Sequence, residues 1–174
     1  MAWSRVCRST SRFSFQSTGG PDRPDVWRGA VDPKGFRERY PSHEYGARPW
    51  NRNVNFNSQN HNKRACVIDL AHPRGLELAK RLAAASDAVI ENFSARVMGK
   101  LGLGYAALAE VNSRIILLSM PGYGLTGPQR DWVAWGPTIE ANAGMCHLIG
   151  YRDGPPLTTG YAFNDPVAGL AGCA

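Results

Sequence analysis

The sequence predicts an α/β fold built on a parallel sheet. Three short apolar runs, residues 65–70, 87–93 and 114–120, have the length and the β-branched content of buried strands. Stretches with apolar residues at helical spacing separate these runs. Because strands that alternate with helices form parallel sheets with right-handed crossovers, the three runs are expected to share one layer.

The connections between these strands are predicted to be helical. The first helix is expected within residues 73–86, because Pro73 stands at a favoured first-turn position and apolar residues recur on one face. Residues 94–111 predict one or two short helices, interrupted by Gly102 and Gly104. The last predicted strand, residues 114–120, is apolar nearly throughout, as expected for a strand covered on both faces.

The C-terminal part begins with a loop, residues 121–131, followed by a predicted helix over about 137–149 and turns over 151–160. A further helix is expected after Pro166. Asp165 precedes this proline, and a residue before proline is displaced from helical geometry, which suits the N-cap position.

The N-terminal part shows little periodicity. Residues 1–18 contain three arginines, five serines and no acidic residue, which is a composition similar to that of an organelle transit peptide. The interpretation that we favour is a poorly ordered leader or an artefactual start. Residues 19–60 are predicted to be an irregular segment rich in Pro, Gly and Asn, and residues 61–174 to be the α/β domain.

Composition limits the class of protein. A chain of 174 residues with 43% hydrophobic residues can form one domain with a real core, and no apolar run is long enough to span a bilayer. Four cysteines without a CxxC spacing favour a reducing, cytoplasmic compartment. The net charge of +6 comes from the first 64 residues, where basic residues are dispersed, which argues against a nucleic-acid-binding patch.

Several common sites are excluded by their missing context. The GYGLTG run matches GxGxxG, but Pro121 follows the predicted strand and no periodic helix begins in the turn, so a tight glycine loop is favoured over an NAD site. The four histidines lack partners at ligand spacing, so no metal site is predicted. Ser119 does not stand in a GxSxG turn, and the chain contains no P-loop.

Asp165 is the strongest candidate for a functional residue. On spacing alone it is a helix N-cap. However, small residues surround it, which allows a ligand or another chain to approach closely. These residues are Gly160, Ala162, Ala168, Gly169, Ala171 and Gly172. Both interpretations, a cap and a reactive carboxylate, stay open on this pattern.

Four motifs in order resemble the family III CoA-transferases, the CaiB/BaiF family. They are NKR before a strand ending in DL and HPxG; ENF before LGLGY; NxRxIxxSxxGxGxTGP; and DGPPxxxGxxxxDPVAG. The resemblance runs from about Arg48 to Ala174. It implies a Rossmann-like parallel sheet with flanking helices, incomplete relative to the interlocked dimer that family members form.

The resemblance also implies a mechanism in which Asp165 attacks the thioester carbonyl of an acyl-CoA. An acyl-aspartyl anhydride and then an aspartyl-CoA thioester would follow, and an acceptor carboxylic acid would take the CoA. Aspartate, with an ordinary pKa of about 3.9, needs no general base, and a thiol with a pKa of about 8.5 leaves without a general acid. One carboxylate therefore suffices.

By position, the resemblance assigns CoA binding to Ile68, Ala71, Asn92, Phe93 and Lys100. Phe93 would stack on adenine and Lys100 would pair with phosphate, although a core role for Phe93 and a solvated role for Lys100 fit the pattern equally. Two positions depart from the family. Ala71 stands where members often carry lysine, and residues 94–96 replace the usual RPG-like run, so some phosphate affinity is either missing or supplied by Arg64 or Arg96.

Two alternatives to an active transferase remain. Some members are acyl-CoA racemases that use a histidine beside the aspartate; Trp135 stands at that position here, which disfavours racemisation. Family members are also about twice as long, so the resemblance implies a fragment. The fragment would be either a subunit completed by a complementary chain or second copy, or an inactive remnant.

Overall fold

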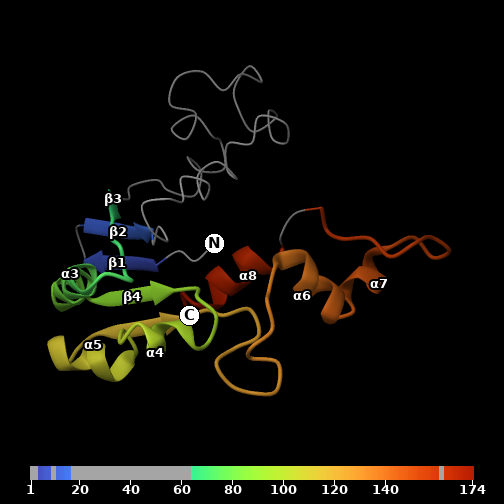
Figure 1. The fold of residues 1–174 in the computed structure, drawn as a ribbon. Coiled ribbons are helices and arrows are strands. Elements are labelled where there is room, and N and C mark those ends of the chain that lie inside the picture. The colour runs from blue at the N-terminus through green and yellow to red at the C-terminus, as the bar shows by residue number, and fades with distance from the viewer. Residues whose placement is uncertain (1–3, 9–10, 17–63, 161–162) are drawn as a thin grey trace, which may run out of the picture.

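The computed structural model describes residues 4–8, 11–16, 64–160 and 163–174 (Figure 1). The elements in chain order are β1 (Ser4–Arg8), β2 (Ser11–Gln16), β3 (Arg64–Val67), α3 (Pro73–Ala84), β4 (Ala88–Glu91), α4 (Val97–Lys100), α5 (Tyr105–Val111), β5 (Ile116–Ser119), α6 (Gly136–Asn142), α7 (Met145–Ile149) and α8 (Asn164–Ala171). Each of the three predicted strands is present, with ends that differ from the predicted ones by one to three residues; β3 starts one residue earlier, and every other end is shortened.

Within the described residues the strands form one sheet in the order β3-β2-β1-β4-β5. β2 pairs parallel with β3, and β4 pairs parallel with β5, whereas β1 is antiparallel to both of its neighbours. The three predicted strands therefore run in one direction, which confirms the α/β class. β1 makes the sheet mixed, and the β1–β2 hairpin separates β3 from β4.

The hairpin lies in the segment for which the sequence predicts a poorly ordered leader. The sequence of β2, SRFSFQ, alternates polar and aromatic residues, which is the period of a strand. This alternation covers only six residues, whereas the arginine and serine content of residues 1–18 as a whole is typical of a leader. The division at residues 18 and 60 stays a prediction, and the irregular segment 19–60 lies outside the described residues.

One face of the sheet carries the apolar core. α3 and α5 contact one another and supply buried residues to it. The buried set is Ile68, Leu70, Ala79, Ala83, Val89, Met98, Leu103, Leu108 and Ile115. Every member lies between residues 68 and 115. The α/β layer is therefore the part of the described chain that apolar burial holds together.

The turn between β3 and α3 explains the HPxG motif. Asp69 accepts a hydrogen bond from the backbone N–H of Ala71 through Oδ1 at 2.9 Å, and His72 caps α3 by accepting from the N–H of Arg74 at 3.2 Å. A Cβ on Gly75 would lie 1.8 Å from the carbonyl oxygen of Asp69. α3 can start this close to the strand only because residue 75 has no side chain.

The C-terminal helices differ from their predicted bounds. The helix predicted over 137–149 is divided into α6 and α7, because Gly144 takes a left-handed conformation with φ +74°. α8 starts at Asn164, so Asp165 lies in its first turn and is not the N-cap. A helix can include the residue before a proline at its first turn, where the proline disrupts no intrahelical hydrogen bond.

α8 joins the C-terminal helices to the sheet. Its start contacts α6, where the Asn164 side chain donates to the carbonyl of Gly136 at 3.3 Å. Near its end, a Cβ on Gly172 would lie 2.9 Å from the Leu118 side chain on β5. Since neighbouring Leu117 packs on the core, Leu118 points to the opposite face. The end of α8 therefore covers the face opposite α3 and α5.

No helix in the described parts of the chain is long and apolar enough to cross a membrane.

Candidate active site at the carboxyl edge of the sheet

The carboxyl ends of β3, β4 and β5 lie along the same edge of the sheet, because the three strands are parallel. Ala71 follows β3 and is exposed, and Asn92 follows β4 and is also exposed. In open α/β sheets, ligands bind outside the carboxyl ends of the strands. Two strands intervene between β3 and β4, so their ends are about 14 Å apart at the usual strand spacing.

The two apolar candidates for CoA binding take part in the core. Ile68 is buried, with 9% of its surface exposed, and Phe93 is half-buried and packs against the core cluster. The Phe93 backbone N–H donates to the buried carboxylate of Glu91 at 2.7 Å, which fixes the chain where it leaves β4. Ile68 therefore offers little exposed surface to a ligand at this edge, whereas Phe93 is partly exposed.

Lys100 is the last residue of α4 and is exposed. It forms no ion pair with another described residue. An exposed ammonium group is able to pair with a phosphate as a point charge.

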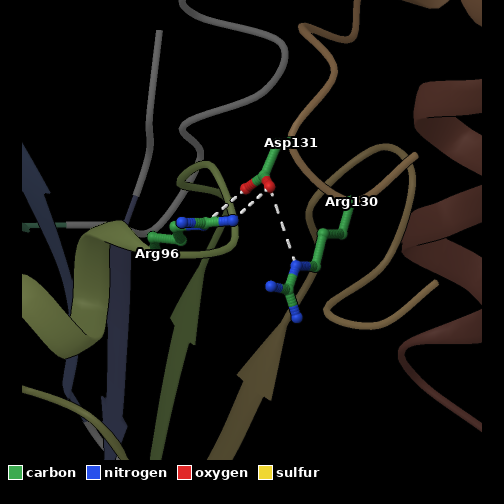
Figure 2. Close-up of polar contacts among 3 residues, drawn as sticks. All are labelled: Arg96, Arg130 and Asp131. Atoms are coloured by element: carbon green, nitrogen blue, oxygen red, sulfur yellow. Dashed lines mark hydrogen bonds and ion pairs between the residues drawn. The ribbon is translucent and has the colours of Figure 1, made fainter. Parts of the chain in front are cut away.

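Arg96 is held by an acidic partner from a distant loop (Figure 2). Its Nε and Nη2 donate to the two carboxylate oxygens of Asp131 at 2.8 and 2.5 Å, while Arg130 lies 3.7 Å from the same carboxylate. The hydrogen bond from Arg96 lowers the pKa of the Asp131 carboxyl. This ion pair connects the segment after β4 to the glycine loop after β5. A phosphate would have to displace Asp131 to make the same two hydrogen bonds with Arg96.

The glycine loop is compact and does not open into a helix. Gly124 and Gly127 have φ values of +80° and +86°, and the next helix begins only at Gly136. A Cβ on Gly122 would lie 2.1 Å from that of Ala134, so the loop folds back on itself. The predicted tight loop is confirmed, and the strand–turn–helix geometry of a dinucleotide fingerprint is not formed.

A second set of contacts connects this loop to α6. The Tyr123 hydroxyl accepts from the Asn142 side chain at 2.5 Å, and its ring meets Trp132 edge-on with the centroids 5.7 Å apart. The glycine loop is thus attached on one side to the segment after β4 and on the other to α6.

Asp165 is exposed in the first turn of α8, where an anion is favoured by the helix dipole. Among the described residues its carboxylate has no hydrogen-bond or ion-pair partner. An open, unpaired carboxylate is available to react with an incoming carbonyl group. Within the described part of the chain, no hydrogen bond or ion pair joins Asp165 to Asn92, Phe93 or Lys100.

The sequence prediction missed Glu140, which has 1% of its surface exposed. Its Oε1 accepts from the Thr159 hydroxyl at 2.7 Å and from the Phe163 N–H at 3.2 Å, and its Oε2 accepts from the Thr159 N–H at 3.1 Å. The hydroxyl bond from Thr159 is the main cause of the lowered pKa of Glu140. One signal was available: Glu140 is the single Asp, Glu, Lys or Arg between Asp131 and Arg152.

A cavity beside α3 does not include Ala71, Asn92, Lys100 or Asp165. It has a volume of about 340 Å³ and is lined by Cys66, Ile68, Leu78, Arg81 and Leu82. Burial raises the pKa of the Cys66 thiol. No three His, Cys, Asp or Glu side chains in the described ranges come together as a metal site.

Residues 28–174 match the model of CoA-transferase family III. The chain is 39% identical over 117 residues to the succinyl-CoA–L-malate CoA-transferase beta subunit of Chloroflexus aurantiacus, covering 67% of this chain and 29% of that protein. It is 35% identical over 115 residues to the succinyl-CoA:glutarate CoA-transferase of Mus musculus, covering 66% and 26%.

The fold has relatives among solved structures. A CaiB/BaiF family protein from Brucella suis superposes with a TM-score of 0.61 at 34% identity, covering 66% of this chain and 31% of that one. The chain spans less than a third of the length of each of these relatives. The matched residues include the parallel strands, the glycine loop and the segment that carries Asp165, and the chain belongs to CoA-transferase family III.

Proposed function

We propose that this chain takes part in the transfer of coenzyme A from an acyl-CoA thioester to a carboxylic acid, with Asp165 as the nucleophile. The observation that carries the proposal is the exposed, unpaired carboxylate of Asp165 within a segment that matches the family. Two other side chains support a one-carboxylate mechanism. Trp135, which stands where racemase members carry histidine, cannot carry a proton, and Glu140 already accepts three hydrogen bonds.

The proposed reaction balances without an added acid or base. An oxygen of Asp165 attacks the thioester carbonyl, the C–S bond breaks, and CoA leaves as a thiolate, so that a mixed anhydride is formed. The thiolate then attacks the aspartyl carbonyl and releases the donor acid as a carboxylate. The acceptor carboxylate attacks the resulting aspartyl-CoA thioester, which releases the thiolate and forms a second mixed anhydride. The thiolate then attacks the acceptor's carbonyl carbon in this anhydride, which gives the acceptor's CoA thioester and frees the Asp165 carboxylate.

For binding, we propose that the CoA moiety lies along the carboxyl edge of the sheet. The backbone at Ile68 and Ala71, the groups at Asn92 and Phe93, and the ammonium of Lys100 would contact it. Exposure of Ala71, Asn92 and Lys100 supports this arrangement. We further propose that the protein acts in the cytoplasm, and that a second copy or a complementary chain completes the site.

The test uses succinyl-CoA as the acyl donor and hydroxylamine as the trap. Hydroxylamine converts an aspartyl anhydride or thioester into a hydroxamate, which peptide mass spectrometry locates. We expect a succinyl-CoA-dependent hydroxamate at Asp165 in the wild type and in D153N, a matched change at an exposed aspartate of the preceding turn. D165N should carry none.

An inactive remnant predicts the opposite result. In that case the wild type shows no modification that depends on succinyl-CoA and melts without cooperativity. An equal hydroxamate yield in D165N would mean that another group reacts, and the proposed mechanism would be wrong.

A further inference from the structure

Glu140 on α6 is the most completely buried charged side chain among the described residues. Burying a carboxylate costs free energy unless its oxygens accept hydrogen bonds. Here both oxygens are satisfied, and all three donors belong to two residues that precede α8, Thr159 and Phe163. Within the described residues, the Glu140 carboxylate therefore binds the residues before α8 and makes no hydrogen bond within its own helix, α6.

The two residues that donate to Glu140 lie just before Asp165 in the chain. Phe163 is the residue before α8, two residues before Asp165. One carboxylate thus holds the chain that leads to Asp165 at both Thr159 and Phe163. The Asn164 side chain adds a bond from the first residue of α8 to the carbonyl of Gly136, at the start of α6. Figure 1 shows α6 and α8 next to one another, and the two helices are in contact.

Glu140 is ionised in this arrangement. Hydrogen bonds to the ionised form lower its pKa, so the group stays charged near neutral pH. With its oxygens already occupied by donors, it is not placed to carry a proton during the reaction.

We propose that Glu140 is a positioning residue, which holds Thr159 and Phe163 and thereby fixes the start of α8 and the direction of the Asp165 carboxylate. This rests on the proposed function of Asp165. A misplacement of about 1 Å in a reacting group is able to cost about 100-fold in rate. Loss of the Glu140 contacts should therefore slow the attack on the thioester without changing how CoA binds.

The experiment compares three full-length variants. E140Q keeps the size of the side chain but places an amide N–H₂ against one of the donors. T159V keeps the shape of residue 159 and its backbone N–H but removes the hydroxyl donor. E77Q makes the same chemical change at an exposed position on α3 and is the control.

Two measurements are made on each variant. Hydrogen–deuterium exchange of the peptide that covers residues 157–170 reports whether the start of α8 is held. The initial rate of hydroxamate formation at Asp165, measured against succinyl-CoA concentration, separates the maximal rate from the half-saturating concentration. We expect faster exchange and a maximal rate lower by about 10-fold or more in E140Q, with half-saturation unchanged. T159V should fall between wild type and E140Q, and E77Q should match wild type.

Each other outcome has a defined meaning. Exchange unchanged in both E140Q and T159V would overturn the inference, as would faster exchange with an unchanged maximal rate. If E140Q does not fold, T159V decides. If the wild type forms no hydroxamate, the proposed function fails, and the exchange rates alone decide whether Glu140 holds the start of α8.

Discussion

The α/β layer, residues 66–120, and the C-terminal part, residues 121–174, are stabilised in different ways. All nine buried apolar residues of the core cluster belong to the layer. In the C-terminal part the buried residues are Gly136 and Glu140, and no apolar side chain among its described residues is fully buried. Trp135, Leu148 and Leu170 each expose 70% or more of their surface there.

This difference shows that apolar burial shapes the layer, whereas hydrogen bonds shape the part that carries Asp165. Segments with few buried apolar contacts open at lower free energy than core strands and helices. A reactive carboxylate on such a part needs specific polar contacts to be held in one place. The buried carboxylate of Glu140 supplies them.

The strongest test of this comparison is a pair of leucine truncations. Leu108, on α5, is 2% exposed, so L108A should lower the free energy of unfolding by about 2–5 kcal/mol. Leu170, on α8, is 73% exposed, so L170A should change it by no more than about 0.5 kcal/mol. Urea denaturation of both variants measures the contrast. Equal losses would mean that α8 is buried in solution, and the comparison would fail.

A second, smaller effect is expected at the turn between β3 and α3. A methyl group on Gly75 would meet the carbonyl of Asp69, so G75A should destabilise the layer by about 1–3 kcal/mol. Gly99 on α4 has nothing within 4 Å of a Cβ, and G99A is the matched control, expected to be neutral or slightly stabilising. Thermal melts of the two variants distinguish them. A neutral G75A would show that α3 does not start this close to β3.

The smallest effect is a dependence on acid in the C-terminal part. Because the folded state lowers the pKa of Glu140, its stabilisation is complete above the ordinary glutamate pKa of about 4.3 and is lost as the pH falls through the lower folded value. The difference in Tm between wild type and E140Q should therefore be constant between about pH 6 and 8 and shrink below about pH 4. A difference that grows on acidification would contradict the assignment of Glu140 as ionised.

Much of this protein was predictable from local pattern. The strands at 65–70, 87–93 and 114–120 appear within one to three residues of their predicted ends, and α3 begins at Pro73 as expected. Gly102 takes a positive φ and Gly104 precedes α5, in the region where one or two short helices are predicted and α4 and α5 form. Periodicity, proline and glycine report geometry that forms over a few residues, which is why these predictions succeeded.

The sequence by itself thus determined the α/β class, the family motifs and the choice of Asp165. Tertiary structure alone decided the strand order, with β1 and β2 between β3 and β4, and the partners of the buried and paired charges. Arg96 meets Asp131 across 35 residues, and Glu140 meets Phe163 across 23. Such pairs form only when the tertiary fold brings distant parts of the chain together, and local sequence periodicity carries no information about this.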